Sequence, residues 1–116
     1  MSTNRETFET TYEINVGSSK EFEATILDPD TGSPKSLEDA VAYNNGIVQI
    51  LKPDGTQIGT DIVLTFSVRE DGIVTFTVLD TITTPQNAGN WKGKIIFKNS
   101  SNIIVDQQSF GFNILE

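Results

Sequence analysis

The side chains that could do chemistry in this chain are its carboxylates. The 116 residues include 16 Asp and Glu but no His and no Cys. The commonest general base, the commonest transition-metal ligand and every thiol nucleophile are therefore missing, which excludes Ser-His-Asp and Cys-His arrangements. A pair of carboxylates could still catalyse glycoside hydrolysis, but most of the acids fall in expected turns or on the outward side of expected strands. The sequence predicts a protein that is not an enzyme.

The spacing Asp28-x-Asp30-x-Gly32 is the acidic pattern that most resembles a metal site. A helix–loop–helix calcium loop needs Gly at its sixth position and Glu at its twelfth, whereas here Gly32 is fifth and Asp39 is twelfth. We expect a turn in which the Asp28 side chain bonds to the backbone, with a structural ion between loops as the alternative. Residues 55–59, GTQIG, lack the Lys-Ser/Thr ending of a phosphate loop. No cofactor and no metal are predicted.

The net charge of −8 narrows the class of partner. Nucleic acid is not expected, because its phosphates need a basic face. Many acids lie in the first thirty residues, which we interpret as a solvated sheet face, with a patch that docks on a basic partner as the alternative. The opening residues MSTNRE have no apolar run, and no segment approaches the ~20 apolar residues of a membrane span. Neither a signal peptide nor a membrane contact is predicted.

Alternation of apolar and polar residues with a period of two recurs along the chain and predicts strands. The first strand is expected from Phe8 onward, after a polar arm at 1–7, and the second over 20–27. Two hairpins are predicted from their turn residues. One turns at Lys52-Pro53-Asp54-Gly55 and the other at Arg69-Glu70-Asp71-Gly72.

Three further segments complete the expected fold. Residues 62–68 alternate as one strand. Residues 36–42 are the only candidate helix, expected as a short helix or turn across one end of the domain. In the last strand the alternation slips near Gln107-Gln108, with Ile103 and Val105 out of phase with the apolar residues that follow. This slip indicates a β-bulge or a change of sheet.

Many short strands, frequent turn signals and almost no helix are typical of a β-sandwich. We expect an all-β, immunoglobulin-like β-sandwich of about seven to eight antiparallel strands, with at most one short helix near 36–42. A small barrel is the structural alternative. Residues 8–116 are expected to form this single domain after the arm at 1–7. Trp91 alternates in phase with Ile95 and Phe97 and is therefore expected in the core.

The order of motifs along nearly the whole chain resembles a known family. The motifs are DTGSP at 30–34, KPDGT at 52–56, DGIV at 71–74, AGNWKG at 88–93 and FGFNI at 110–114. Together they resemble the N-terminal immunoglobulin-like domain of tailed-phage baseplate upper proteins and related small virion domains. Gly89-Asn90-Trp91 also resembles the corner at the start of strand F in immunoglobulin folds, with Trp in place of Tyr.

The resemblance implies a structural virion protein of a tailed bacteriophage, made in the host cytoplasm. Such a protein would act as a head-decoration protein or as a tail, baseplate or fibre adaptor. Its expected partners are other virion proteins (capsid, tail or fibre subunits), with self-association as a further option. A host-surface or carbohydrate-binding module, with Tyr43 and the 80–90 loop at its site, is the alternative. The residues expected to contact a partner are Arg5, Glu6, Thr7, Phe8, Tyr43, Asn44 and Asn45.

Overall fold

A computed structural model describes residues 10–116 of the protein. The predicted arm at 1–7 and the predicted start of the first strand at Phe8 lie outside the described residues. Within them, the chain forms eight strands and two 3₁₀ turns, η1 (Arg69–Asp71) and η2 (Pro85–Asn87). The strands are β1 (Thr11–Asn15), β2 (Lys20–Thr25), β3 (Asn45–Leu51), β4 (Gln57–Val63), β5 (Thr65–Val68), β6 (Ile73–Val78), β7 (Gly89–Lys98) and β8 (Ile104–Leu115).

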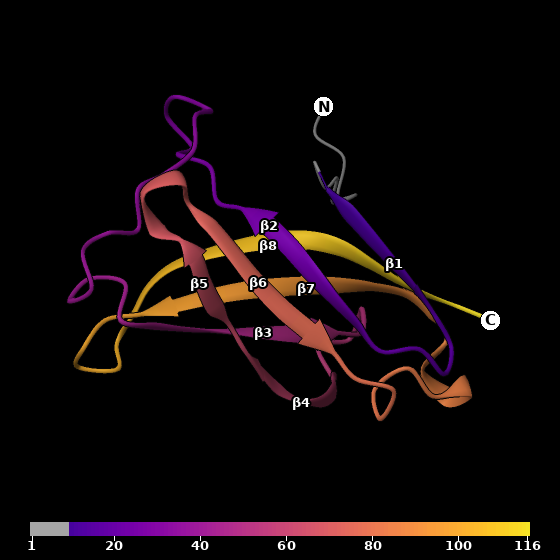
Figure 1. The fold of residues 1–116 in the computed structure, drawn as a ribbon. Helices are drawn as coiled ribbons and strands as arrows, with labels where there is room; N and C mark the ends of the chain where they lie inside the picture. Colours follow the sequence, from indigo (N-terminus) through magenta and orange to yellow (C-terminus); the bar gives the residue numbers. More distant parts are fainter. Residues whose placement is uncertain (1–9) are drawn as a thin grey trace, which may run out of the picture.

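The strands form two packed sheets, which confirms the predicted all-β sandwich. One sheet has the order β1-β8-β7-β3-β4, and the other has the order β2-β6-β5. Figure 1 shows the three-stranded sheet crossing over the five-stranded one. If β2 to β8 are lettered B, C, C′, D, E, F and G, the sheets read B-E-D and G-F-C-C′, which is the immunoglobulin-like arrangement.

One strand departs from the predicted antiparallel arrangement. β1 pairs with β8 in parallel, with Thr11 opposite Gly111 and Asn15 opposite Leu115. Parallel neighbours need a long connection, and here the rest of the domain supplies it. Gly17, with φ of +85°, then turns the chain so that the next strand enters the other sheet.

The segment predicted as a short helix or turn near 36–42 is a turn. Its closing hydrogen bond runs from the Tyr43 N–H to the Asp39 carbonyl, at 2.8 Å. The Leu37 side chain is fully buried, and its N–H donates to the Arg69 carbonyl at 2.8 Å. This bond and the buried Leu37 side chain hold the segment against the β5–β6 turn.

The single strand predicted over 62–68 is two strands in different sheets. β4 ends at Val63, Leu64 is buried between the sheets, and β5 begins at Thr65. The Leu64 N–H donates to the Gly46 carbonyl at 3.0 Å, which fixes the crossing point. The hairpin that follows is confirmed, and Gly72 closes it with a φ of +69°.

The β-bulge predicted in the last strand is present, slightly earlier in the chain than expected. Asp106 pairs with Phe97 while Ile104 pairs with Lys98, so Val105 is the extra residue. Beyond the bulge, the even-numbered positions of β8 point into the core. Its three large inward residues are Phe110, Phe112 and Ile114.

The core between the sheets is built around aromatic rings. Phe22 of β2 stacks on Phe76 of β6 with ring centroids 5.5 Å apart, and Phe110 of β8 lies 5.6 Å from Phe76. Tyr12 of β1 meets Phe22 and Phe110 edge-on, each at 5.3 Å. These contacts join both sheets and bring β1 against the core.

Trp91 forms the predicted corner at the start of β7. Its indole N–H donates to the Asn87 carbonyl, four residues upstream, at 2.8 Å. The ring is half-buried and packs against the core cluster, and Lys52 Nζ lies 5.9 Å from its centroid. The prediction that Trp91 belongs to the core is confirmed for the part of the ring that packs inward.

Gly93 in the middle of β7 lets the Phe110 ring pack directly against the backbone. A Cβ placed on Gly93 would lie 2.1 Å from the Phe110 ring. Any side chain at 93 would therefore displace the Phe110 ring, which is fully enclosed between the sheets.

We expect Gly93→Ala to lower the free energy of unfolding by about 1–3 kcal/mol, the usual cost of overpacking a core. Chemical denaturation checks this. The matched control is Asn90→Ala on an exposed position of the same strand, for which we expect a change within about 0.5 kcal/mol. A Gly93→Ala protein as stable as the control would contradict this account of the core.

Candidate functional site

Among residues 10–116, no three His, Cys, Asp or Glu side chains gather where they could hold a metal ion. The Asp28 region forms the expected turn, because the Asp28 carboxylate accepts the Asp30 N–H at 2.8 Å. The candidate sites of the domain are two surfaces that could bind a partner.

Of the predicted partner-binding residues, three lie within the described residues and Arg5, Glu6, Thr7 and Phe8 lie outside them. Tyr43 is half-buried, and its ring meets the Phe97 ring edge-on at 5.7 Å. Lys35 Nζ lies 5.3 Å from the Tyr43 ring centroid. The tyrosine therefore closes one end of the core rather than standing free on the surface.

The polar neighbours of Tyr43 lie more openly at the same end. Asn44 is exposed, and its backbone N–H donates to the Lys98 carbonyl at 3.0 Å. Asn45 opens β3 and pairs with Lys98, which in turn pairs with Ile104. The structure thus aligns the predicted Tyr43–Asn45 segment with the hairpin between β7 and β8.

Beside these residues is a group of exposed apolar side chains that the sequence reasoning did not identify as a surface. Four of the seven large apolar residues strongly exposed within 10–116 belong to two adjoining segments. They are Val41 (66% exposed), Ile103 (61%), Ile104 (48%) and Val105 (44%). The Ser100 N–H donates to the Val41 carbonyl at 2.9 Å, which joins the two segments. We call Val41 and Ile103–Val105 the apolar end.

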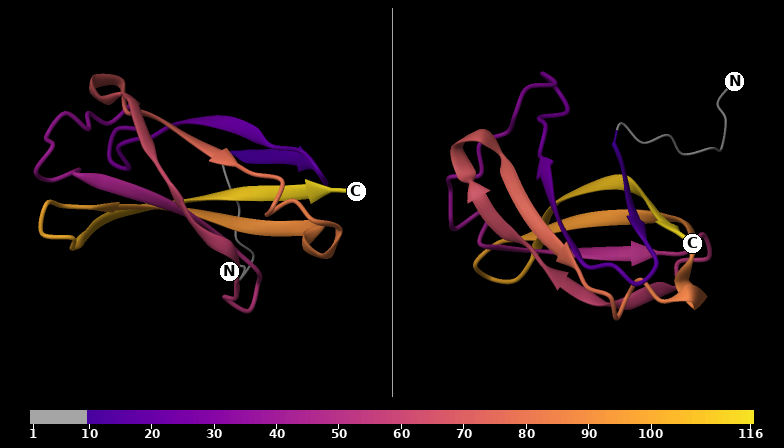
Figure 2. Two further views of the ribbon diagram at one scale, coloured as in Figure 1. Left: turned by 60° about the horizontal axis from the view of Figure 1, so that its bottom comes forward. Right: turned by 45° about the vertical axis from the view of Figure 1, so that its right-hand side comes forward.

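The apolar end lies opposite the end of the sandwich that carries the C-terminus. In both views of Figure 2, the yellow-orange hairpin around residue 100 is at one end, and the orange turn η2 and the C-terminus are at the other. Three consecutive apolar residues at 103–105 are the sequence signal for this surface, because alternate strand positions cannot all face one core.

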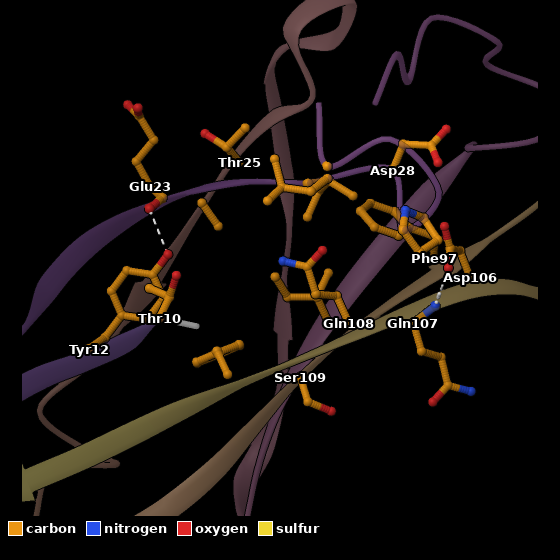
Figure 3. A pocket seen from close by; sticks show the side chains of 17 residues that line it. Thr10, Tyr12, Glu23, Thr25, Asp28, Phe97, Asp106, Gln107, Gln108 and Ser109 are labelled. Carbon is orange, nitrogen blue, oxygen red and sulfur yellow. Dashed lines mark hydrogen bonds between the residues drawn. The ribbon is translucent and has the colours of Figure 1, made fainter. Parts of the chain in front are cut away.

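A second surface is a cleft of 820 Å³ along one side of the sandwich. Figure 3 shows it between β8, at Gln107, Gln108 and Ser109, and the opposing segment from Glu23 to Asp28. Thr10 and Tyr12 close one end. Most of the apolar residues beneath it are buried, and its accessible wall is polar and apolar in nearly equal parts.

Two polar contacts define the ends of this cleft. At one end, the Tyr12 hydroxyl donates to the Glu23 carbonyl at 2.9 Å and links the two sheets. Burial, and then the charge of Glu23, raise the pKa of the Tyr12 phenol. Toward the other end, Lys35 Nζ and Asp106 Oδ2 form an ion pair at 2.8 Å. Hydrogen bonding to Asp106 raises the pKa of Lys35.

The chain matches no protein-family model, and no curated protein is detectably similar to it in sequence. Within residues 10–116, none of the helical segments is long and apolar enough to cross a membrane.

The raised pKa of Tyr12 leads to a prediction for stability at high pH. Because the folded state favours the neutral phenol, its contribution to stability is fully present below the unfolded pKa of about 10. The contribution is lost as pH rises through the higher folded pKa. Ultraviolet titration of a Tyr43→Phe variant, which keeps only Tyr12 as tyrosine, should give a midpoint above 10.

The control for this prediction is Tyr12→Phe, which cannot ionise at this position. Denaturation measured on either side of pH 10 should show a steeper loss of stability in the parent than in Tyr12→Phe. A Tyr12 midpoint at or below 10 would contradict the buried, sheet-linking position of its hydroxyl.

Proposed function

We propose that this protein is a structural, non-enzymatic component of a tailed-phage virion. It would act as a head-decoration protein or as a tail, baseplate or fibre adaptor, through contacts with other virion proteins. The apolar end is the observation that carries the proposal. Exposed apolar groups gathered on one surface of a small domain are typical of protein-binding sites.

The positions of the family-like motifs support this reading. The KPDGT motif at 52–56 forms the turn between β3 and β4, and the AGNWKG motif at 88–93 opens β7 with the Trp91 corner. The FGFNI motif at 110–114 lies in β8 and supplies core residues to the five-stranded sheet. These three motifs therefore lie at a turn, at a strand start and in the core of the sandwich.

The surroundings of the apolar end favour binding over chemistry. Its neighbours are backbone groups, the Asn44 and Asn45 amides and Lys98. An apolar centre with polar neighbours resembles a protein-binding patch with its rim. The carbohydrate-binding alternative needs the Tyr43 ring as a stacking platform. That ring already contacts the Phe97 ring and the Lys35 ammonium group. We therefore propose protein binding alone.

We expect Ile103→Asp to weaken incorporation into particles about tenfold or more while leaving the domain folded. A buried charge at the centre of an interface costs far more than the same charge in water, and tenfold corresponds to about 1.4 kcal/mol. Ile103 is largely exposed in the domain, so we expect the free energy of unfolding to change by no more than about 0.5 kcal/mol. Competition between variant and parent for particles lacking the protein measures the effect.

Ser101→Asp is the matched control, because it adds the same charge to an exposed position of the same hairpin. Ser101→Asp should be incorporated nearly as well as the parent. Equal incorporation of parent, Ile103→Asp and Ser101→Asp would remove the apolar end from the proposed function.

A second prediction concerns the predicted polar arm at 1–7. This segment is too short and too polar to pack alone. We therefore expect it to contribute to assembly through contact with a partner, for example by strand addition. Deleting 1–7 should weaken assembly without unfolding the domain, because both sheets lie within the described residues. Unchanged incorporation of the shortened protein would sink this idea, and circular dichroism and thermal unfolding would check the fold.

A further inference from the structure

Among residues 10–116, the outer edge of β8 is covered along only part of its length. β1 pairs with β8 from Gly111 to Leu115, and Thr10 contributes one more contact by accepting the Gly111 N–H at 2.9 Å. β8 itself begins at Ile104. Within residues 10–116, no strand pairs with this edge before Gly111. Several residues of β8 before Gly111 therefore have no strand partner on this side among the residues that the structure describes.

The direction of the backbone groups along this open stretch follows from the Gly111 bond. Backbone orientation in a strand repeats every second residue, so the N–H groups of Ser109 and Gln107 face the same side as that of Gly111. The Gln107 N–H confirms the direction, because it donates to the adjacent Asp106 side chain at 2.9 Å rather than to β7. The Ser109 and Gln107 carbonyls also face outward and are ready to accept hydrogen bonds.

The cleft of 820 Å³ lies directly beside this open edge. Its opposite wall is the end of β2 and the residues after it, from Glu23 to Asp28, as Figure 3 shows. The edge from 105 to 109 spans about 17 Å at roughly 3.3 Å per residue. A cleft with the backbone groups of β8 along one wall suits an extended peptide segment, which could add to β8 as a further strand.

Charge selects the kind of segment that fits. Three acidic residues line the cleft: Glu23, Asp28 and Asp106. The nearby Lys35 already forms an ion pair with Asp106. A second copy of this chain would bring the same acids against them and add to a net charge of −8. Like charges brought together across an interface disfavour association, whereas a basic segment gains from the same field.

We propose that the β8 edge at 105–109 is a strand-acceptor site for an extended, basic segment of another virion protein. The proposal deepens the proposed function and rests on it, because it supplies a site and a partner chemistry for assembly. The segment would form backbone hydrogen bonds with Ser109 and Gln107 and place Lys or Arg side chains near Glu23 and Asp28. The apolar end continues the site, since β8 starts at Ile104.

The central test uses the full-length protein and a short synthetic peptide in which valine alternates with lysine. Nuclear magnetic resonance should show peptide-induced shifts in the amides of residues 105–109, and titration gives the affinity. A matched peptide with glutamate in place of lysine should bind at least tenfold more weakly. Raising the salt concentration should weaken the binding of the lysine peptide, because salt screens exposed charge pairs.

Ser109→Pro is the variant that isolates the edge. The Ser109 N–H points away from β7, so proline removes a donor that takes no part in the pairing of β8 with β7, as is tolerated on edge strands. Binding of the lysine peptide should fall at least tenfold, while Ser109→Ala should bind like the parent. If Ser109→Pro fails to fold, the pair Glu23→Gln and Asp28→Asn tests the same site through its charge, with an expected loss of severalfold.

Three results would overturn the proposal. One is equal binding of the lysine peptide to the parent, to Ser109→Pro and to the charge variant, or no binding at all. Another is strong hydrogen-exchange protection of the Ser109 amide in the full-length protein without peptide, which would mean that the protein's own N-terminal segment or a second copy already covers the edge. The third is peptide-induced shifts confined to other strands. None of these measurements depends on particles, so the virion role is judged separately by the Ile103→Asp comparison.

Discussion

The parallel pairing of β1 with β8 is the constraint on which the rest of the structure depends. It joins the first described strand to the last, and the bond from the Val16 N–H to the Leu115 carbonyl, at 2.7 Å, extends it by one residue. The pairing also carries Tyr12 into the space between the sheets, where its ring meets aromatic rings from both. Among residues 10–116, the pairing covers β8 only from Gly111 onward.

Features determined by neighbouring residues could be predicted from the sequence. The β5–β6 hairpin follows from residues that favour a tight turn, ending in a glycine that adopts positive φ. The inward positions of β2 and β6 follow from simple alternation, and Phe22 and Phe76 meet in the core as that pattern implies. The Trp91 corner was also predictable, because a ring at this point of the fold hydrogen-bonds to backbone only four residues away.

Features determined by distant residues could not be predicted in this way. Alternation shows that a strand has a buried face but not which strand lies beside it, so the parallel partner of β1 was missed. The change of sheet at Leu64 has the same cause, since its alternation continues unbroken from one sheet to the other. Of the candidate site, the predicted residues Tyr43–Asn45 lie beside the hairpin between β7 and β8, and their role in binding stays a prediction. The exposed residues at 103–105 were assigned to a strand, because the bulge that turns them outward depends on pairing with β7.

The open edge and the acidic charge of this domain are best understood together. An uncovered strand edge can pair with any exposed strand, and proteins limit this hazard with charge, bulges or short edges. Here the bulge at Val105 interrupts the regular edge, and the Asp106 carboxylate accepts a hydrogen bond from the Gln107 N–H. The surrounding acids repel further copies of the same chain, which also carries a net charge of −8. Under the proposal, this charge would act differently on two classes of partner. It would disfavour pairing between copies of this chain and favour a basic strand, which would have to displace the Asp106 contact at the Gln107 N–H.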